Sequence, residues 1–371
     1  MKVIHLVLGK ANPNRMNGVS KVAHFHAMYL HRIGVNTEIW GITRTPEAPV
    51  TEREVPTRLF RGQSIIRGLD PSLMLAIERL KGKIVFHIHG ALIPDFYLVT
   101  KILCEKKIPY IYTPHGAFNE VALQKNKLIK KIYINSFEKW ILRHAKKVQF
   151  LGKSEYDHIT KLVTLHNKVV IPNGQCLEEM SFEYKKIKHQ NEPVFGFCGR
   201  LDNYYKGLDL LLTAFADYKS NGGKGELWLI GDGPDRQKLE QMVIALDLSA
   251  YVTFHGARYG QEKLNFIANM DVFVHPSHSE GSPTAVLEAA ALSIPLLVTT
   301  GTNVGPLVEK YQCGIHIHSN KSTNIAAALK KFGALYQTDS LDEMKKGALR
   351  MVEAEFDWEN IAKQLAVIYQ S

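Results

Sequence analysis

The chain has 371 residues, 45% of them hydrophobic, and no apolar run long enough to span a bilayer, which predicts about two globular domains and excludes a membrane helix. The formal net charge is +10, but residues 1–180 carry +13 and residues 181–371 carry −3, so an anionic surface partner belongs to the first half. Four cysteines lie far apart, which favours neither a disulfide framework nor a zinc site.

The amino-terminal segment MKVIHLVLGK has one lysine and a short apolar run before Gly9, so it is typical of a first strand rather than a signal peptide. This predicts a cytoplasmic protein.

Short apolar runs then alternate with helix-length segments. In the first half these runs lie at 3–9, 37–42, 84–90, 109–116, 148–152 and 169–174. In the second half they lie at 193–199, 226–233, 251–256, 272–277, 295–300 and 313–317. The alternation predicts an α/β protein with two doubly wound parallel-sheet domains that face each other across a cleft, with ligands at the carboxyl ends of the strands.

The segment SEGSPTAVLEAAA (279–291) places two carboxylates, Glu280 and Glu288, around a Gly-Ser-Pro turn. Pro283 suits the first position of a helix, and Ser282 suits the cap before it. Glu280 would then lie in the loop after a strand and Glu288 inside the helix. The alternative is that both are ordinary solvated acids.

The start of this helix is a candidate anion site, because the N–H groups of Thr284 and Ala285 and the positive end of the helix dipole point toward the loop. A sugar nucleotide would offer hydroxyl groups to the two acids and a phosphate to the helix. We therefore expect Ser282, Pro283 and Thr284 to line a substrate site.

A second segment, 197–218, supplies cations. Gly199 and Arg200 follow a buried strand, and Lys206 and Gly207 open an amphipathic helix. Arginine offers a forked donor and lysine a compact charge, which together suit a diphosphate that gains charge as it leaves. The alternative is a pair of solvated cations at a strand–helix junction.

Together these segments resemble the retaining glycosyltransferases of family 4, which have the GT-B fold of two Rossmann-like domains. The resemblance covers nearly the whole chain and is strongest over 196–295. Its motifs are NGVSKVA, TPHGAF and IPNG in the first half, and GRLDNYYKG, LWLIGDGPDRQKLE, VTFHGA and DVFVHPSHSEGSPTAVLEAAALSIP in the second.

The resemblance implies roles for the charged residues of the second half. The residues matching Arg200 and Lys206 hold the donor diphosphate. The residue matching Glu280 contacts the donor sugar, and the one matching Glu288 binds the ribose hydroxyl groups.

The resemblance also implies a domain arrangement. An acceptor domain would cover 1–174, with the terminal helix 357–371 packing back onto it, and a nucleotide-sugar donor domain would cover 175–356. In the acceptor domain, the residue matching His115 lies near the transferred sugar, and the glycine-rich turn matching Gly18 closes on the phosphates.

The sequence departs from the family pattern at four places. Asn17 replaces a glycine, although asparagine tolerates a left-handed backbone. Ser293 replaces the glycine before Ile-Pro. Ser282 stands where an aromatic residue is frequent, and the segment 301–310 lacks the usual acid at its helix start.

Other motifs favour neither a cofactor nor a catalytic metal. The segment 231–236 has Gly-x-Gly after a strand but lacks the third glycine of a dinucleotide fingerprint. The chain has no Asp-x-Asp, and no His/Cys cluster has ligand spacing. His87 and His89 are interpreted as structural histidines with satisfied hydrogen bonds, and His115 as the catalytic candidate.

The segment Lys125–Lys147 combines apolar residues at helical spacing with lysines and an arginine on many of the remaining positions. One interpretation is a domain helix with a solvated cationic face. The other is contact with anionic lipid headgroups or a charged acceptor.

The leading hypothesis is a retaining, metal-independent hexosyltransferase that moves a sugar from a nucleoside diphosphate, UDP in preference to GDP, to a saccharide or polyprenyl-linked saccharide. Lipopolysaccharide, O-antigen or exopolysaccharide synthesis at the inner face of a bacterial membrane is the expected setting, with no nucleic-acid partner. The alternatives are a sugar-nucleotide epimerase of the same fold and a non-catalytic nucleotide or glycan binder.

Overall fold

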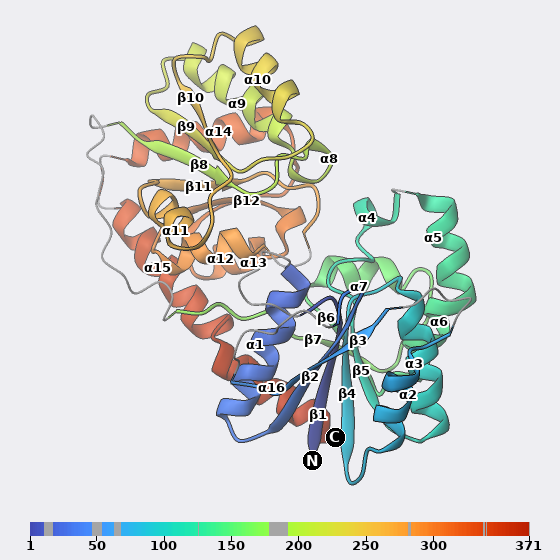
Figure 1. Ribbon diagram of the computed structural model, residues 1–371. Helices are drawn as coiled ribbons and strands as arrows, with labels where there is room; N and C mark the ends of the chain where they lie inside the picture. Colours follow the sequence, from blue (N-terminus) through green and yellow to red (C-terminus); the bar gives the residue numbers. More distant parts are fainter. Residues whose placement is uncertain are drawn as a thin grey trace. The chain divides into compact units, whose positions relative to one another are not determined.

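The computed structural model describes residues 1–10, 18–46, 54–62, 68–124, 126–177, 192–280, 283–336, 338 and 340–370. Contacts divide the chain into two compact units, Met1–Gly174 with Trp358–Ser371, and Gln175–Asp357. Each unit has its own hydrophobic core on the faces of its own sheet. Figure 1 shows the elements of both.

The first unit is built on a parallel seven-stranded sheet of order β3-β2-β1-β4-β5-β6-β7. Its strands are β1 (Lys2–Leu8), β2 (Asn36–Thr43), β3 (Thr57–Arg61), β4 (Ile84–His89), β5 (Tyr110–Thr113), β6 (Lys147–Phe150) and β7 (Lys168–Val170). Strands β1, β2, β4 and β5 are almost wholly buried, because helices cover both faces of a parallel sheet.

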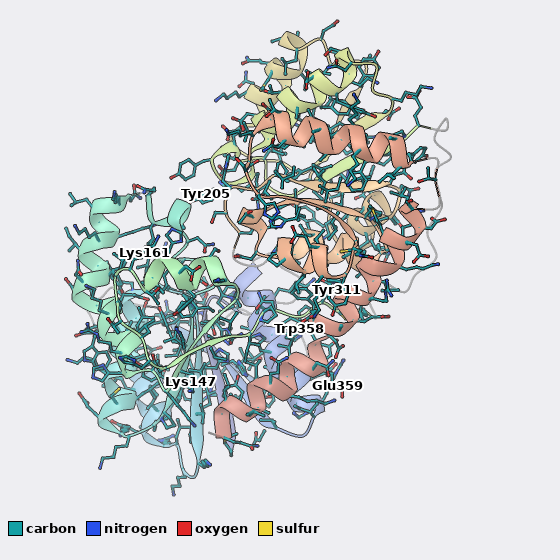
Figure 2. The ribbon with its side chains drawn as sticks, turned by 180° about the vertical axis from the view of Figure 1, so that it is seen from behind. Lys147, Lys161, Tyr205, Tyr311, Trp358 and Glu359 are labelled. Atoms are coloured by element: carbon teal, nitrogen blue, oxygen red, sulfur yellow. The ribbon has the colours of Figure 1, made fainter. Side chains whose placement is uncertain are left out.

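The helices of the first unit lie on both faces of this sheet. They are α1 (Gly18–Arg32), α2 (Pro71–Glu78), α3 (Pro94–Glu105), α4 (Glu120–Gln124), α5 (Lys127–Tyr133), the π-helical turn η2 (Ile134–Glu138), α6 (Lys139–His144), α7 (Lys153–Ile159) and α16 (Trp358–Gln370). Helices α1 and α16 cover one face, and α2, α3 and α6 cover the other (Figure 1). Trp358 anchors α16, because its ring stacks on Tyr29 of α1 at 5.8 Å between ring centroids (Figure 2).

The second unit has a parallel six-stranded sheet of order β10-β9-β8-β11-β12-β13. Its strands are β8 (Val194–Cys198), β9 (Glu226–Ile230), β10 (Val252–Gly256), β11 (Val272–His275), β12 (Leu296–Thr299) and β13 (Gly314–Ile317). Its helices are α8 (Asn203–Lys206), α9 (Leu208–Ser220), α10 (Arg236–Ala245), α11 (Gly260–Ala268), α12 (Thr284–Ala291), η4 (Thr300–Thr302), α13 (Gly305–Lys310), α14 (Ser322–Leu335) and α15 (Ser340–Glu355). Helices α9, α10 and α14 pack in one core cluster, and α11, α12, α13 and α15 in the other.

The predicted α/β class with two doubly wound parallel sheets is confirmed, and two local expectations are wrong. The segment Lys125–Lys147 is not one helix, because the π-helical turn η2 separates α5 from α6, and Lys147 begins β6. Lys125 lies outside the described residues. Pro283 caps α12 instead of beginning it, because its ψ of 72° is not helical.

Among the described residues, no helix combines the length and the apolarity needed to cross a bilayer.

Candidate functional site

The loop after β8 carries the first predicted cation. A Cβ on Gly231, at the end of β9, would lie 1.8 Å from the Gly199 carbonyl oxygen, so the two strand ends approach too closely for a side chain there. Arg200 follows, with 68% of its side chain exposed and its Nε 3.9 Å from Oδ2 of Asp202. This ion pair is loose and leaves most of the guanidinium donors available to a ligand.

Lys206 is positioned by the tight junction between α8 and α9. Gly207 adopts a left-handed conformation with φ of 62°, and a Cβ there would lie 2.5 Å from the Pro276 carbonyl oxygen. The glycine therefore lets this junction pack against the loop after β11. As a result the Lys206 ammonium forms an ion pair with Glu280, and only 17% and 13% of the two side chains are exposed.

The Glu280 carboxylate accepts hydrogen bonds from three side chains. Besides Lys206, His275 Nε2 donates to Glu280 Oε1 at 2.8 Å and Ser277 Oγ donates at 3.2 Å. Burial opposes ionisation, but the charge of Lys206 and the His275 hydrogen bond outweigh it and lower the pKa of Glu280 to about 2. Within the described residues Oε2 has no partner, so an ionised oxygen remains for a ligand hydroxyl.

Glu288 forms the second buried ion pair. It lies on the second turn of α12 and is 3% exposed, and Lys263 Nζ of α11 donates to its Oε1 at 2.6 Å. Its Oε2 is buried without a hydrogen-bond partner among the described residues. The interpretation of Glu280 and Glu288 as ordinary solvated acids is therefore wrong.

Both ion pairs lie close to Cys198, the last residue of β8. The charges of Lys263, Glu288 and Lys206 all affect the pKa of the Cys198 thiol, which burial raises to about 12. Two buried acid–lysine pairs therefore share the carboxyl edge of the sheet, where ligands of doubly wound proteins bind.

The start of α12 adds main-chain donors to this edge. The Pro283 carbonyl accepts from Val286 and Leu287 N–H, and within the described residues the Thr284 and Ala285 N–H groups have no acceptor. Together with the helix dipole they can bind an anion. Ser282, which was predicted as the cap, lies outside the described residues.

The two remaining predicted site residues, His115 and Gly18, belong to the first unit. His115 follows β5 with a left-handed φ of 54°, and burial lowers its pKa to about 3, so the ring is neutral. Its Nε2 lies 3.0 Å from His89 Nδ1. Gly18 begins α1, and a Cβ there would meet nothing within 4 Å.

Reasoning from the sequence missed three groups of this site. Lys263 lies on an amphipathic helix with no local motif, and only the tertiary contact with Glu288 identifies it. His275 and Ser277 lie just before the segment 279–291 that was singled out for its acids, and their place at the end of β11 was the available signal.

The fold and the site define a class: a GT-B protein of two Rossmann-like units, in which one sheet carries paired charges and a helix amino terminus at its carboxyl edge. Two family models match the chain, "Glycosyltransferase Family 4" over residues 16–179 and "Glycosyl transferases group 1" over residues 179–350. Together they cover most of the chain, which belongs to the family 4 type of GT-B glycosyltransferases.

Curated relatives and solved structures agree with this family. A putative colanic acid biosynthesis glycosyltransferase, WcaL of Escherichia coli, is 29% identical over 45% of this chain and 42% of its own length. The alpha-monoglucosyldiacylglycerol synthase of Streptococcus pneumoniae is 24% identical over 81% of this chain and 64% of its own length. These matches span 42% and 64% of the lengths of the two relatives. The structure of Anabaena HepE in complex with UDP superposes with a TM-score of 0.74 at 16% identity over all of both chains.

Proposed function

We propose that the protein is a retaining hexosyltransferase that moves a sugar from a nucleoside diphosphate to a saccharide or lipid-linked saccharide of the bacterial cell envelope. The observation that carries this proposal is the pair of buried acid–lysine contacts, Lys206 with Glu280 and Lys263 with Glu288, beside the start of α12. Buried charges are costly, and a ligand-binding role accounts for keeping two pairs at one strand edge.

The cations would stabilise the leaving diphosphate. An ammonium has three donors, and Lys206 uses one on Glu280, so two remain for phosphate oxygens. The exposed guanidinium of Arg200 and the N–H groups of Thr284 and Ala285, which have no acceptor among the described residues, would bind the other oxygens. Charge that develops on the leaving group would thus meet preorganised donors.

The two acids would orient the rest of the donor. Glu280 is ionised, and its Oε2, which has no partner in the described part of the chain, would accept a hydroxyl of the transferred sugar. The buried Oε2 of Glu288 also has no partner there, and it would accept a ribose hydroxyl. We expect His115, as a neutral imidazole in the first unit, to contact the transferred sugar.

Retention and metal independence are the finer parts of the proposal. A front-face substitution needs cation support for the leaving phosphate and accurate placement of the sugar, which Lys206 and Arg200 would supply without a protein nucleophile. The sequence has no Asp-x-Asp motif to hold a metal–diphosphate complex. We expect UDP rather than GDP as the nucleotide, because the structurally similar HepE of Anabaena was solved in complex with UDP.

The acceptor would be reached at an anionic membrane surface on the cytoplasmic side. Helix α5 has no buried residue, and Leu128, Ile129 and Ile132 are 72%, 71% and 58% exposed. A groove of about 480 Å³ beside them is lined by five lysines of α5, α6 and the segment after α7, namely Lys127, Lys130, Lys131, Lys139 and Lys161. No acid of the described residues lines it. Figure 2 labels Lys161 on this side of the first unit. Exposed aliphatic side chains beside lysines match the chemistry of an anionic lipid interface.

The transfer step is tested with Lys206→Ala, and with Lys238→Ala as the control, because Lys238 is an exposed lysine on α10 of the same unit. Loss of one transition-state donor should lower kcat by about 10²–10³. Sugar transfer from UDP-hexoses to a panel of saccharide acceptors, and product analysis without acceptor, are the measurements. Near-native kcat in folded Lys206→Ala would contradict the diphosphate role, and an epimerised sugar nucleotide would favour the epimerase.

The membrane step is tested with two matched substitutions. Ile129 of α5 and Ile244 of α10 are equally exposed, at 71% and 70%. Ile129→Ser should weaken flotation with anionic liposomes, and Ile244→Ser should not. Salt should weaken flotation of the native chain, since screening acts over a Debye length. Equal flotation with neutral and anionic vesicles would leave a soluble acceptor as the better assignment.

A further inference from the structure

A cluster of histidines is buried in the core of the first unit. His5 comes from β1, His26 from α1, and His87 and His89 from β4, and all four are 0% exposed. Each offers one ring nitrogen, and these four atoms lie within 4.8 Å of one another. No stretch of the sequence has ligand spacing, because the fold assembles the group from three separate elements.

Hydrogen bonds account for only part of this cluster. His87 is used at both nitrogens, by the Tyr369 hydroxyl at 2.6 Å and by Thr113 Oγ1 at 2.7 Å. His89 has partners at both nitrogens too, His5 at 3.0 Å and His115 at 3.0 Å.

Three ring nitrogens of the cluster have no partner in the described part of the chain. Both nitrogens of His26, and Nε2 of His5, are buried without a hydrogen-bond partner among the described residues. Every neutral imidazole has one N–H and one lone pair, so at least one buried donor on His26 is unsatisfied. Such groups are rare in folded proteins and commonly indicate a missing water or ion.

A neutral histidine has one ring nitrogen without a proton, and that nitrogen is the atom that binds a metal ion. The four rings are wholly buried, and each places one nitrogen in the same group.

We propose that this cluster is a closed structural site for one zinc ion or a similar late first-row divalent ion. His5, His26 and His89 would be the first three ligands, and His87 the fourth once it gives up one of its two hydrogen bonds. An all-nitrogen donor set suits zinc, nickel or cobalt and does not suit magnesium or calcium, which prefer oxygen.

One pair of ring nitrogens already has nearly the spacing that zinc requires, and the whole group, within 4.8 Å, would contract on binding. His5 Nδ1 and His89 Nε2 lie 3.0 Å apart. Bonds of about 2.0–2.1 Å in a tetrahedron set the ligand atoms roughly 3.3 Å apart. The metal would take the place of the proton that these two nitrogens share, and that proton would move to His5 Nε2, so the exchange releases no proton.

Metal binding would fix the hydrogen bond between His89, a proposed ligand, and the candidate catalytic residue His115. A ligating histidine donates its other N–H to a second partner, and here His89 Nδ1–H would donate to His115 Nε2 at 3.0 Å. His115 would then carry its own proton on Nδ1. Because all four ligands are buried, no coordination position is open to substrate, and the ion would stabilise the unit without taking part in transfer.

The test uses the full chain, expressed without a polyhistidine tag and depleted of metal. Titration with cobalt should give one equivalent per chain and the intense visible absorption of tetrahedral cobalt, and zinc should displace it. Zinc should also raise the Tm, since an ion that binds only the folded state stabilises it by mass action. X-ray absorption of the zinc-loaded chain should show four nitrogen neighbours at about 2.0 Å.

Paired substitutions localise the ion. His26→Asn should abolish the cobalt absorption, and His24→Asn, two residues earlier on α1 and outside the cluster, should leave it unchanged. Equal binding in both variants, or substoichiometric binding by the native chain, would overturn the proposal. If His26→Asn does not fold, the metal neighbours of the native chain decide, and a shell containing sulfur or mainly oxygen counts against it. None of these measurements depends on sugar transfer.

Discussion

The two sheets place different polar groups at the same topological position. Strand order reverses between β1 and β4 in the first unit and between β8 and β11 in the second. Near the first position lie buried, neutral imidazoles, among them His5 and His89. Near the second lie ionised groups held in pairs, such as Lys206 with Glu280.

The difference shows two ways in which a protein tolerates polar groups in its interior. The imidazoles avoid the cost of burial by staying uncharged, and the carboxylates avoid it by pairing with lysines. Protonation should destabilise a buried cluster of uncharged groups, and removal of one partner should destabilise a buried ion pair. The two units should therefore respond to different perturbations.

Low pH should unfold the first unit before the second, and this is the largest effect on stability that we expect. The pKa of His5 falls from 6.5 to about 3 on folding, so the unfolded state binds more protons below pH 6.5, and stability declines from there toward pH 3. The full shift corresponds to about 5 kcal/mol for this residue. Glu280 has its pKa lowered from 4.5 to about 2, so its contribution is kept above pH 4.5 and lost only below it.

Hydrogen exchange followed by mass spectrometry on the metal-depleted chain measures this order. At pH 5 peptides of β1 and β4 should lose protection while those of β8 and β11 keep it. Loss of protection in the second unit first would contradict the comparison.

Removing one partner should damage the second unit. Lys263→Met leaves Glu288 charged and buried, which should cost about 3–5 kcal/mol of stability. Lys330→Met changes an exposed lysine of α14 and should cost little. Urea unfolding of the second unit is the measurement, and the double variant Lys263→Met, Glu288→Leu should recover most of the loss. An unchanged midpoint for Lys263→Met would mean that the pair contributes nothing to folding.

The two acids of the second unit should separate in kinetics. Glu280→Gln should lower kcat, and Glu288→Gln should weaken binding of UDP, each by about 1.5–3 kcal/mol, as expected for a hydrogen bond to a charged group. Calorimetry with UDP and initial rates with saturating donor distinguish them. Weaker UDP binding in Glu280→Gln alone would reverse the two assignments.

The smallest expected effect concerns the residue that follows a helix, because in each unit at least one such residue has a left-handed backbone conformation. Ser293 after α12 and Lys107 after α3 have positive φ values of 60° and 56°. Glycine carries no penalty in this conformation, so Ser293→Gly and Lys107→Gly should each stabilise by about 1 kcal/mol. Thermal unfolding measures both, and a lower Tm in either variant would show that its side chain makes a compensating contact.

The sequence predicted the fold class well, because buried parallel strands are continuous apolar runs. Every predicted run overlaps a strand, and the strand of the described residues that was missed is β3, Thr57–Arg61. This strand pairs only with β2 at the sheet edge, and most of its positions are not buried, so it lacks the apolar signal.

The candidate site was predictable only in part. The acids and cations lie in recognisable motifs, but the contacts that define their state join Lys206 to Glu280 across 74 residues. Spacing cannot predict such partners. The histidine cluster has a weaker signal in the sequence. His87 and His89 are two residues apart on one strand and so share a face, and His5 lies opposite His87 on the neighbouring strand. Nothing local pointed to His26.

The π-helical turn Ile134–Glu138 has a consequence for how the chain can vary. A π turn holds one residue more than an α turn, and each residue of an α-helix rotates it by about 100°. The extra residue is taken up within the widened turn, so deleting one residue here would restore an α turn and leave the lysines and aliphatic side chains of α5 on nearly the same side relative to α6. Related chains that differ in length by one residue at this turn would therefore present the same exposed face of α5.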